Sequence, residues 1–294
     1  MPSANRQAVI ILGMHRSGTS AVAGATVRLG LGPPLTPLPA AVDNPGGFYE
    51  SRLVVHINHH LLRAAGCAWN LSLTFDPDCI EPMLQPSDRE TIAQTLEREF
   101  GTSPAFVLKD PRLCLTLPAW LPPLRAAGIV PSVLIVVRHP AEVVRSLLRR
   151  NQFPERETAP QWLQHMLEAE WLSRGLNRAV VFYDDLMHDW RGCLGRAGER
   201  AGIAWPRPID EAGAEIDAFL SGSARHHAVA ATSAFVGPPG IGDMVNAVWS
   251  TLRYLSEDPD SSVALACLDH VRGQFATWRK EVLPPGLRVV FSDS

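Results

Sequence analysis

A short apolar run that leads directly into a glycine-bracketed loop constrains this chain more than any other feature. Residues 9–12 read Val-Ile-Ile-Leu, which is typical of a parallel strand covered on both faces. Gly13 and Gly18 enclose four residues that must turn tightly, and a helix is expected over residues 19–29, ending at Gly30. The first turn of a helix presents free N–H groups and the positive end of the helix dipole. The segment therefore predicts a phosphate-binding loop.

The loop has the glycine spacing of a nucleotide P-loop but differs from it at one position. Thr19 stands where the usual lysine reaches the β- and γ-phosphates, whereas Arg16 places a planar, permanently charged donor inside the loop. Tight turns also use glycine for structural reasons alone, so the loop needs support from a second site. The sequence resembles the 5′-phosphosulfate loop of sulfotransferases that use 3′-phosphoadenosine 5′-phosphosulfate (PAPS). That resemblance implies donor binding by His15, Arg16, Ser17, Gly18, Thr19 and Ser20, with Arg16 also assisting the transfer.

A second candidate site follows the apolar strand at residues 133–137. Arg138 ends this strand, Pro140 can open a helix, and Ser146 lies about two turns into that helix, so Arg138 and Ser146 can face one phosphate. An arginine at a strand end is, by itself, more often a partner in a surface ion pair. The arrangement of Arg138 and Ser146, in this order after the phosphate loop, is similar to the 3′-phosphate site of the same sulfotransferases. The resemblance implies that Arg138 and Ser146 bind the 3′-phosphate of the donor.

The strand expected at residues 105–108 ends in Lys109, and Asp110 and Pro111 form a turn after it. This segment resembles the part of tyrosylprotein-type sulfotransferases whose lysine touches the transferring sulfonate and the leaving phosphate oxygen. Cleavage of the S–O bond builds negative charge on the 5′-phosphate, which a compact ammonium can neutralise. The alternative is a solvated lysine before an ordinary turn. Arg112 either braces Asp110 or contacts the substrate, and both roles fit the sequence.

Sulfonate transfer to a hydroxyl or amine also requires a base that takes the proton of the acceptor. Residues 43–49 are rich in glycine, and Leu53, Ile57 and Leu61 then mark a helix with Glu50 at its start. In carbohydrate and tyrosylprotein sulfotransferases, a glutamate in this part of the chain acts as the base, and the resemblance assigns that role to Glu50. The alternative is a carboxylate that merely benefits from the helix dipole.

Three histidines, His56, His59 and His60, lie on the same expected helix. Cytosolic sulfotransferases use a histidine base two positions after their lysine, but Pro111 occupies that position here. No carboxylate or cysteine close to these histidines in the sequence completes a metal site. We therefore expect a solvated helix face and no metal ion.

The last part of the chain, residues 210–294, is expected to be helical. The strand at residues 179–183 precedes Asp184 and Asp185, which resemble a Tyr-(Glu/Asp)-Asp-Leu segment of the family and are expected to cap the next helix. Many sulfotransferases close the nucleotide site with a basic loop late in the chain, which makes Arg225 a candidate third contact to the 3′-phosphate. An ordinary mobile loop is the alternative, because the Arg-Lys-Gly of the cytosolic family is missing.

Composition limits the range of functions. The chain has 294 residues, of which 46% are hydrophobic and 19% are charged, which is enough for one large α/β domain. The net charge of −3 and the lack of basic runs argue against a nucleic-acid partner. Five widely spaced cysteines suggest reduced thiols, and no stretch is apolar enough to cross a membrane, so we expect a cytoplasmic protein. The missing amino-terminal anchor favours a bacterial source.

These features together predict a single P-loop-like, three-layer α/β/α domain over residues 1–294, with a central parallel sheet. Residues 8–190 form its nucleotide-binding and catalytic core, and residues 210–294 form a helical extension that can carry a lid loop. The predicted function is PAPS-dependent sulfonate transfer to a carbohydrate, lipid, peptide or small metabolite. Two alternatives remain. One is a nucleoside-triphosphate kinase or NTPase, for which Asp184 is the only plausible magnesium ligand, and the other is a non-catalytic nucleotide-binding protein.

Overall fold

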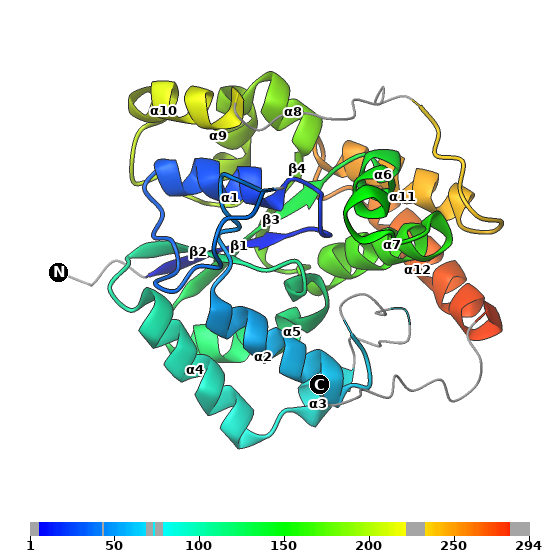
Figure 1. The fold of residues 1–294 in the computed structure, drawn as a ribbon, viewed down its shortest axis with the longest axis horizontal. Coiled ribbons are helices and arrows are strands. Elements are labelled where there is room, and N and C mark those ends of the chain that lie inside the picture. The colour runs from blue at the N-terminus through cyan, green and yellow to red at the C-terminus, as the bar shows by residue number, and fades with distance from the viewer. Residues whose placement is uncertain (1–5, 43, 69–72, 74–78, 222–232, 283–294) are drawn as a thin grey trace.

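A four-stranded parallel sheet forms the centre of the fold (Figure 1). The structure is a computed structural model that describes residues 6–42, 44–68, 73, 79–221 and 233–282. The strands β1 (Gln7–Leu12), β2 (Ala105–Lys109), β3 (Val130–Val137) and β4 (Asn177–Phe182) lie in the order β2-β1-β3-β4. Ile11 of β1 pairs with Lys109 of β2 and with Leu134 of β3. The carboxyl ends of these strands therefore meet at one edge, from which the loops with the predicted site residues depart.

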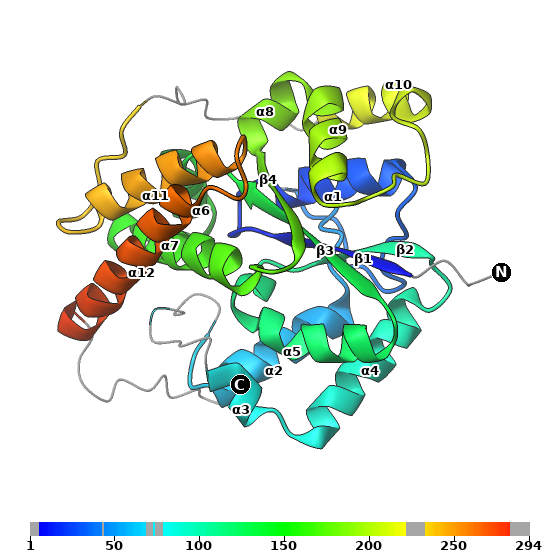
Figure 2. The ribbon, with the colours of Figure 1, turned by 180° about the vertical axis from the view of Figure 1, so that it is seen from behind.

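Helices cover both faces of this sheet (Figures 1 and 2). One face packs against α1 (Thr19–Arg28), α8 (Tyr183–His188), α9 (Trp190–Arg200) and α10 (Ile209–Ser221). The core on the other face includes α2 (Arg52–Ala64), α3 (Ile80–Met83), α4 (Pro86–Phe100), α5 (Leu113–Ala126), α6 (Pro140–Asn151), α7 (Glu155–Leu172), α11 (Gly242–Leu255) and α12 (Ser262–Val282). No helix in the described part of the chain is both long and apolar enough to span a bilayer.

The strand β1 shows why the sheet needs two helical layers. Val9 and Ile11 belong to the first core, whereas Ile10 and Leu12 belong to the second, and all four side chains are fully buried. Because successive side chains of a strand point to opposite faces, a continuous apolar run can be buried only between two layers. The predicted three-layer α/β/α fold with a central parallel sheet is confirmed.

The ends of several helices follow local sequence rules. Pro86 occupies the first turn of α4, and the Asp88 carboxylate accepts a hydrogen bond from the backbone N–H of Gln85 at 2.9 Å. The helix α7 begins at Glu155. Pro154 occupies its N-cap position, and acidic residues in the first turn complement the helix dipole.

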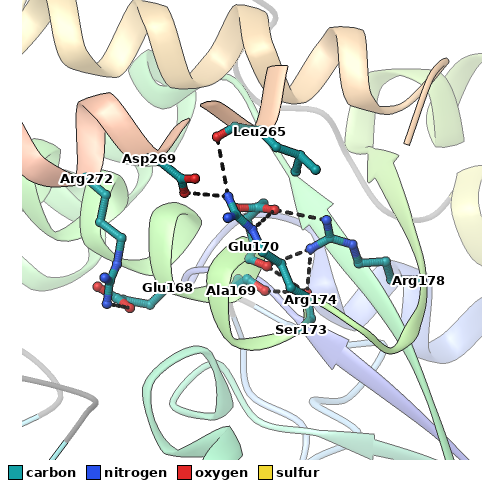
Figure 3. A network of polar contacts seen from close by, with 9 residues as sticks. All are labelled: Glu168, Ala169, Glu170, Ser173, Arg174, Arg178, Leu265, Asp269 and Arg272. Atoms are coloured by element: carbon teal, nitrogen blue, oxygen red, sulfur yellow. Dashed lines mark hydrogen bonds and ion pairs between the residues drawn. The ribbon is translucent and has the colours of Figure 1, made fainter. Parts of the chain in front are cut away.

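A network of ion pairs fastens α12 to α7 (Figure 3). The buried Glu170 carboxylate receives hydrogen bonds from Arg174 and Arg178, at 2.8–2.9 Å. Arg174 also pairs with Asp269 of α12 at 2.7 Å. A further pair joins Glu168 of α7 to Arg272 of α12 at 3.1 Å. The carboxyl-terminal helices are thus attached to the core through α7, on the side of the sheet beyond β3.

Candidate nucleotide and transfer site

The phosphate-type loop joins β1 to α1 in a conformation that its glycines permit. Gly18 caps α1 with φ at +90°, a left-handed conformation that L side chains rarely adopt, and a Cβ atom there would lie 2.1 Å from the Tyr183 ring. Arg16 also has a positive φ, of +70°. The backbone N–H of Gly13 donates to the Sγ atom of Cys114 at 3.0 Å, which ties the start of the loop to α5.

A cleft of about 920 Å³ opens over this loop at the carboxyl edge of the sheet. Predicted site residues from four separate segments line it, namely His15, Arg16, Gly18, Thr19, Ser20, Glu50, Lys109, Arg138 and Ser146. Ser17 does not line the cleft, and its hydroxyl group is buried without a hydrogen-bond partner in the described structure. Arg225 lies outside the described residues. The structure therefore brings together nine of the residues that the sequence singles out, although the four segments that carry them are far apart in the chain.

Lys109, at the end of β2, forms the innermost ion pair of the cleft. Its Nζ atom lies 2.5 Å from Oε1 of Glu50 and 3.3 Å from the hydroxyl oxygen of Ser20, which is in the first turn of α1. The side chains of Lys109 and Glu50 are only 2% and 8% exposed. Lys109 is thus not a solvated residue before a turn. The pair places an ammonium and a carboxylate directly beside the phosphate-type loop.

Glu50 precedes the helix α2, and a backbone hydrogen bond fixes its main chain. The N–H of Leu38 donates to the Glu50 carbonyl at 2.7 Å. The helix α2 begins two residues later, because the Ser51 hydroxyl accepts hydrogen bonds from the N–H groups of Leu53 and Val54 and caps the helix. The expectation that Glu50 starts the helix is therefore wrong by two positions. Capping by Ser51 leaves the Glu50 side chain in the cleft.

Arg138 lies on the opposite side of the loop, directly after β3. Its Nε atom donates to the buried Glu142 carboxylate at 2.7 Å, and its Nη1 atom donates to the Arg16 carbonyl at 3.2 Å. The guanidinium group also stacks on the Tyr183 ring at 4.7 Å. Arg16 in turn donates from Nε to the Ser146 hydroxyl at 2.9 Å. The loop, β3 and α6 are therefore joined around one cationic pair of side chains.

Several residues of the site escaped sequence reasoning. Glu142 follows Arg138 by four positions, and this helical ion-pair spacing was a readable signal. Tyr183 and Phe219 line the cleft from α8 and α10. Tyr183 opens the Tyr-Asp-Asp-Leu segment noted in the sequence, which does not by itself mark the ring as part of a site, and Phe219 has no local motif. Phe219 is held by the Arg28 guanidinium, which lies 3.9 Å from the centre of its ring.

The turn after Lys109 is stabilised by a buried polar network. Asp110 accepts hydrogen bonds from the Arg112 side chain at 2.7 Å and from the Asn58 amide at 2.9 Å. The Asn58 oxygen accepts from the Thr116 hydroxyl and from the Trp120 indole. Burial opposes ionisation of Asp110, but the charge of Arg112 and the hydrogen bond from Asn58 outweigh it and lower the pKa of Asp110. An ionised Asp110 thus fixes the backbone that carries Lys109, which gives Arg112 the bracing role.

Two buried histidines lie near the same turn. Burial, followed by the charge of Arg112, lowers the pKa of His15 well below its usual value. Burial also lowers the pKa of His165 to about 4. Both imidazoles are neutral near pH 7, so the cationic character of the cleft comes from arginine and lysine.

The other aspartates and histidines that the sequence singles out do not line the cleft. Arg253 of α11 donates to Asp184 at 2.9 Å and to Asp185 at 2.6 Å, and both aspartates lie in the first turn of α8, close to their expected capping position. His56 and His60 are exposed on α2, as expected of a solvated helix face. The expectation is wrong for His59, which is half-buried and whose Nε2 atom is buried without a hydrogen-bond partner in the described structure. Burial, followed by the charge of Arg112, lowers the pKa of His59. Within the described ranges, no three side chains of His, Cys, Asp or Glu are arranged to hold a metal ion.

Comparison with solved structures finds a likeness in fold. No family model and no curated protein matches the chain. The fold is similar to that of the sulfotransferase domain of the olefin synthase from Synechococcus PCC 7002, with 18% sequence identity and a TM-score of 0.46. The match covers 94% of this chain and 97% of that domain.

Proposed function

We propose that this protein is a sulfotransferase that moves a sulfonate group from PAPS to a hydroxyl or amine acceptor. The observation that carries the proposal is the buried Lys109–Glu50 pair at the first turn of α1. A base and a cation that stabilises a leaving group must both be within reach of the transferring group. The ion pair meets this requirement at the point where the loop would hold a phosphate.

The charge of the cleft supports an anionic donor. Among the described residues, five cationic side chains and one carboxylate, that of Glu50, line it, while the whole chain has a net charge of −3. The cations are Arg16, Lys109, Arg112, Arg138 and Arg150. The volume of about 920 Å³ also lies within the roughly 300–1,000 Å³ that is usual for ligand sites. A nucleotide with three anionic groups suits such a cleft.

Each part of the donor has candidate partners in this arrangement. Backbone N–H groups of Arg16 and of residues 18–20, at the first turn of α1, would hold the 5′-phosphosulfate, whereas the N–H of Ser17 donates to the Met14 carbonyl at 3.1 Å. Arg138 and Ser146, on the β3 side, would hold the 3′-phosphate. Glu142 orients the Arg138 fork through its 2.7 Å hydrogen bond, so that little side-chain freedom is lost on binding.

The remaining groups can carry out in-line transfer. Glu50 accepts the proton of the acceptor hydroxyl, and the acceptor oxygen forms a bond to sulfur as the bond from sulfur to the 5′-phosphate oxygen breaks. Lys109 neutralises the charge that develops on the departing phosphate oxygen. The products are a sulfate ester, adenosine 3′,5′-bisphosphate and the proton on Glu50, which returns to solvent.

Calorimetric titration tests the proposal directly. Adenosine 3′,5′-bisphosphate, ADP and ATP are each titrated into the protein with and without magnesium. We expect the bisphosphate to bind most tightly and its affinity to be independent of magnesium. Preference for ATP with magnesium would instead favour a kinase or NTPase, which Thr19 at the lysine position and the Arg253-paired Asp184 both disfavour. Bisphosphate binding without transfer to any acceptor would indicate a non-catalytic binding protein.

A further inference from the structure

Arg112 is placed on the acceptor side of the proposed reaction centre. It lies three positions after Lys109, caps α5, and lines the cleft although its side chain is only 9% exposed. The sheet order β2-β1-β3-β4 puts the end of β2, with Lys109 and Arg112, on one side of the phosphate-type loop. Arg138, at the end of β3, lies on the other side. Arg112 therefore shares its side with Glu50, the proposed base.

Bracing of Asp110 uses only part of the Arg112 side chain. The Nη1 atom and the backbone N–H of Arg112 both donate to Oδ1 of Asp110, at 2.7 Å and 3.0 Å. Oδ2 of the same carboxylate is taken by Asn58. The Nε atom of Arg112 is buried and has no hydrogen-bond partner in the described structure. A buried arginine donor without an acceptor is unfavourable unless a ligand supplies the acceptor.

No neighbouring group in the described structure supplies an acceptor for the Nε atom of Arg112. His15 lies within electrostatic reach of Arg112 and Lys109, and it is neutral. The carboxylate of Glu50 is bonded to Lys109, and that of Asp110 is already shared between Arg112 and Asn58. The proposed phosphate contacts of the donor lie at the loop and at β3. The acceptor remains as the source of a further anionic group.

We propose that Arg112 binds a carboxylate of the acceptor, so that the substrate class is a hydroxyl- or amine-bearing carboxylic acid. This inference rests on the proposed sulfotransferase function. A planar guanidinium fork matches a carboxylate better than any neutral group. Anchoring of the carboxylate would hold the acceptor with its hydroxyl toward Glu50. Arg112 thus acts as a specificity-determining residue as well as a brace for the Lys109 turn.

The test uses simple carboxylates as probes of the acceptor side. The protein is first saturated with adenosine 3′,5′-bisphosphate. Acetate, butyrate, hexanoate and benzoate are then titrated at constant ionic strength, each against its own neutral amide. We expect at least one carboxylate to bind about tenfold more tightly than its amide, as is typical of a charge-assisted pair. The Arg112→Gln variant should lose this preference, whereas Arg125→Gln, at the exposed far end of α5, should keep it.

Two further measurements keep the outcome decisive. Bisphosphate affinity shows whether Arg112→Gln is folded, and Arg112→Lys, which keeps the charge but not the fork, should show an intermediate preference. Equal binding of carboxylates and amides by the unaltered protein would overturn the proposal, as would an unchanged preference in Arg112→Gln. Weaker binding of PAPS but not of the bisphosphate would assign Arg112 to the sulfonate of the donor instead. If the bisphosphate itself does not bind, the proposed function fails. The carboxylate titration can then be run without nucleotide, and it still tests whether Arg112 binds a carboxylate.

Discussion

The Lys109 ammonium lies 2.5 Å from the Glu50 carboxylate, although the two residues are 59 positions apart in the chain. Burial of an ion pair costs most of the Coulombic energy that the pair gains, so such a pair is weak evidence for a role in stability. The position of the Lys109–Glu50 pair beside the first turn of α1 indicates a functional role for the pair. The fold brings a proton acceptor and a cation together before any substrate arrives, which is the preorganisation that group transfer requires.

Replacement of Glu50 by glutamine tests the proposed base. The amide oxygen can still accept a hydrogen bond from Lys109, but the side chain cannot take a proton at neutral pH. We expect the transfer rate to fall roughly 10²- to 10⁴-fold, the range for loss of general-base catalysis, while affinity for adenosine 3′,5′-bisphosphate is retained. The effect is measured as the rate at which adenosine 3′,5′-bisphosphate is formed from PAPS in the presence of an acceptor. Glu90→Gln, on the exposed face of α4, is the matched control, and full activity of Glu50→Gln would assign the base role to another group.

Replacement of Arg138 by alanine tests recognition of the 3′-phosphate. We expect binding of adenosine 3′,5′-bisphosphate to weaken roughly 10- to 100-fold, the effect of losing one or two charge-assisted hydrogen bonds. Binding of adenosine 5′-phosphosulfate, which lacks the 3′-phosphate, should change much less. Equal losses for the two ligands would show that Arg138 does not read this group.

The same substitution has a structural side effect that needs its own control. Glu142, only 1% exposed, loses its ion pair with Arg138 when that side chain is removed. Loss of one member of a buried ion pair is destabilising. The comparison of ligands is therefore repeated with the double variant Arg138→Ala/Glu142→Gln, in which both charges of this pair are removed. The ratio of the two affinities should be the same in both backgrounds.

The positions of the strand ends could be predicted from the sequence, because parallel strands expose their carboxyl ends at one edge. Lys109 and Arg138 each follow an apolar run, and the loop between Gly13 and Gly18 follows a third. Local signals of this kind, together with turn chemistry, define the central part of the fold and most of the cleft.

Contacts between distant segments could not be predicted in the same way. The hydrogen bond from Arg16 to Ser146 spans 130 positions, and no periodicity of the chain records it. Phe219 enters the cleft from α10 because it packs against Arg28 of α1, which is a tertiary contact. The backbone of Glu50 is likewise joined to a distant position, because its carbonyl accepts a hydrogen bond from the N–H of Leu38, which no helical periodicity indicates.

The buried His165 predicts a loss of stability in mild acid. Its pKa is lowered by burial to about 4, whereas an unfolded histidine titrates near its ordinary value of about 6.5. Between these values the unfolded chain binds the proton and the folded chain does not, so the stability that is present above pH 6.5 is lost progressively as the pH falls toward 4. The contribution is about 3 kcal/mol in total, on the order of 1.4 kcal/mol for each pH step.

Urea unfolding at pH 7.5, 5.5 and 4.5 measures this effect. His165→Gln should reduce the dependence of unfolding free energy on pH, because glutamine does not titrate. His56→Gln, on the exposed face of α2, should leave the dependence unchanged. An identical pH profile for His165→Gln and the unaltered protein would contradict the prediction.

Gly18→Ala should damage both the loop and the adjacent aromatic ring. A left-handed backbone costs an L residue about 1–2 kcal/mol, and the added Cβ would also meet the Tyr183 ring 2.1 Å away. Gly175→Ala is the matched control, because Gly175 has φ at +76° but no atom within 4 Å of an added Cβ, so it carries the backbone strain alone. We expect the loss of unfolding free energy to be clearly larger for Gly18→Ala, and affinity for adenosine 3′,5′-bisphosphate to fall only in that variant.

A double-variant cycle separates the collision with Tyr183 from the backbone strain. Displacement of the ring would disturb Arg138, which stacks on it at 4.7 Å, and through Arg138 the proposed 3′-phosphate site. When Tyr183 is first replaced by alanine, the three atoms nearest to the added methyl group at position 18 are removed, and we expect only the strain to remain. The effect of Gly18→Ala on unfolding free energy should then approach that of Gly175→Ala. If Gly18→Ala is equally damaging with and without the ring, backbone conformation alone explains the requirement for glycine, and contact with Tyr183 plays no part in it.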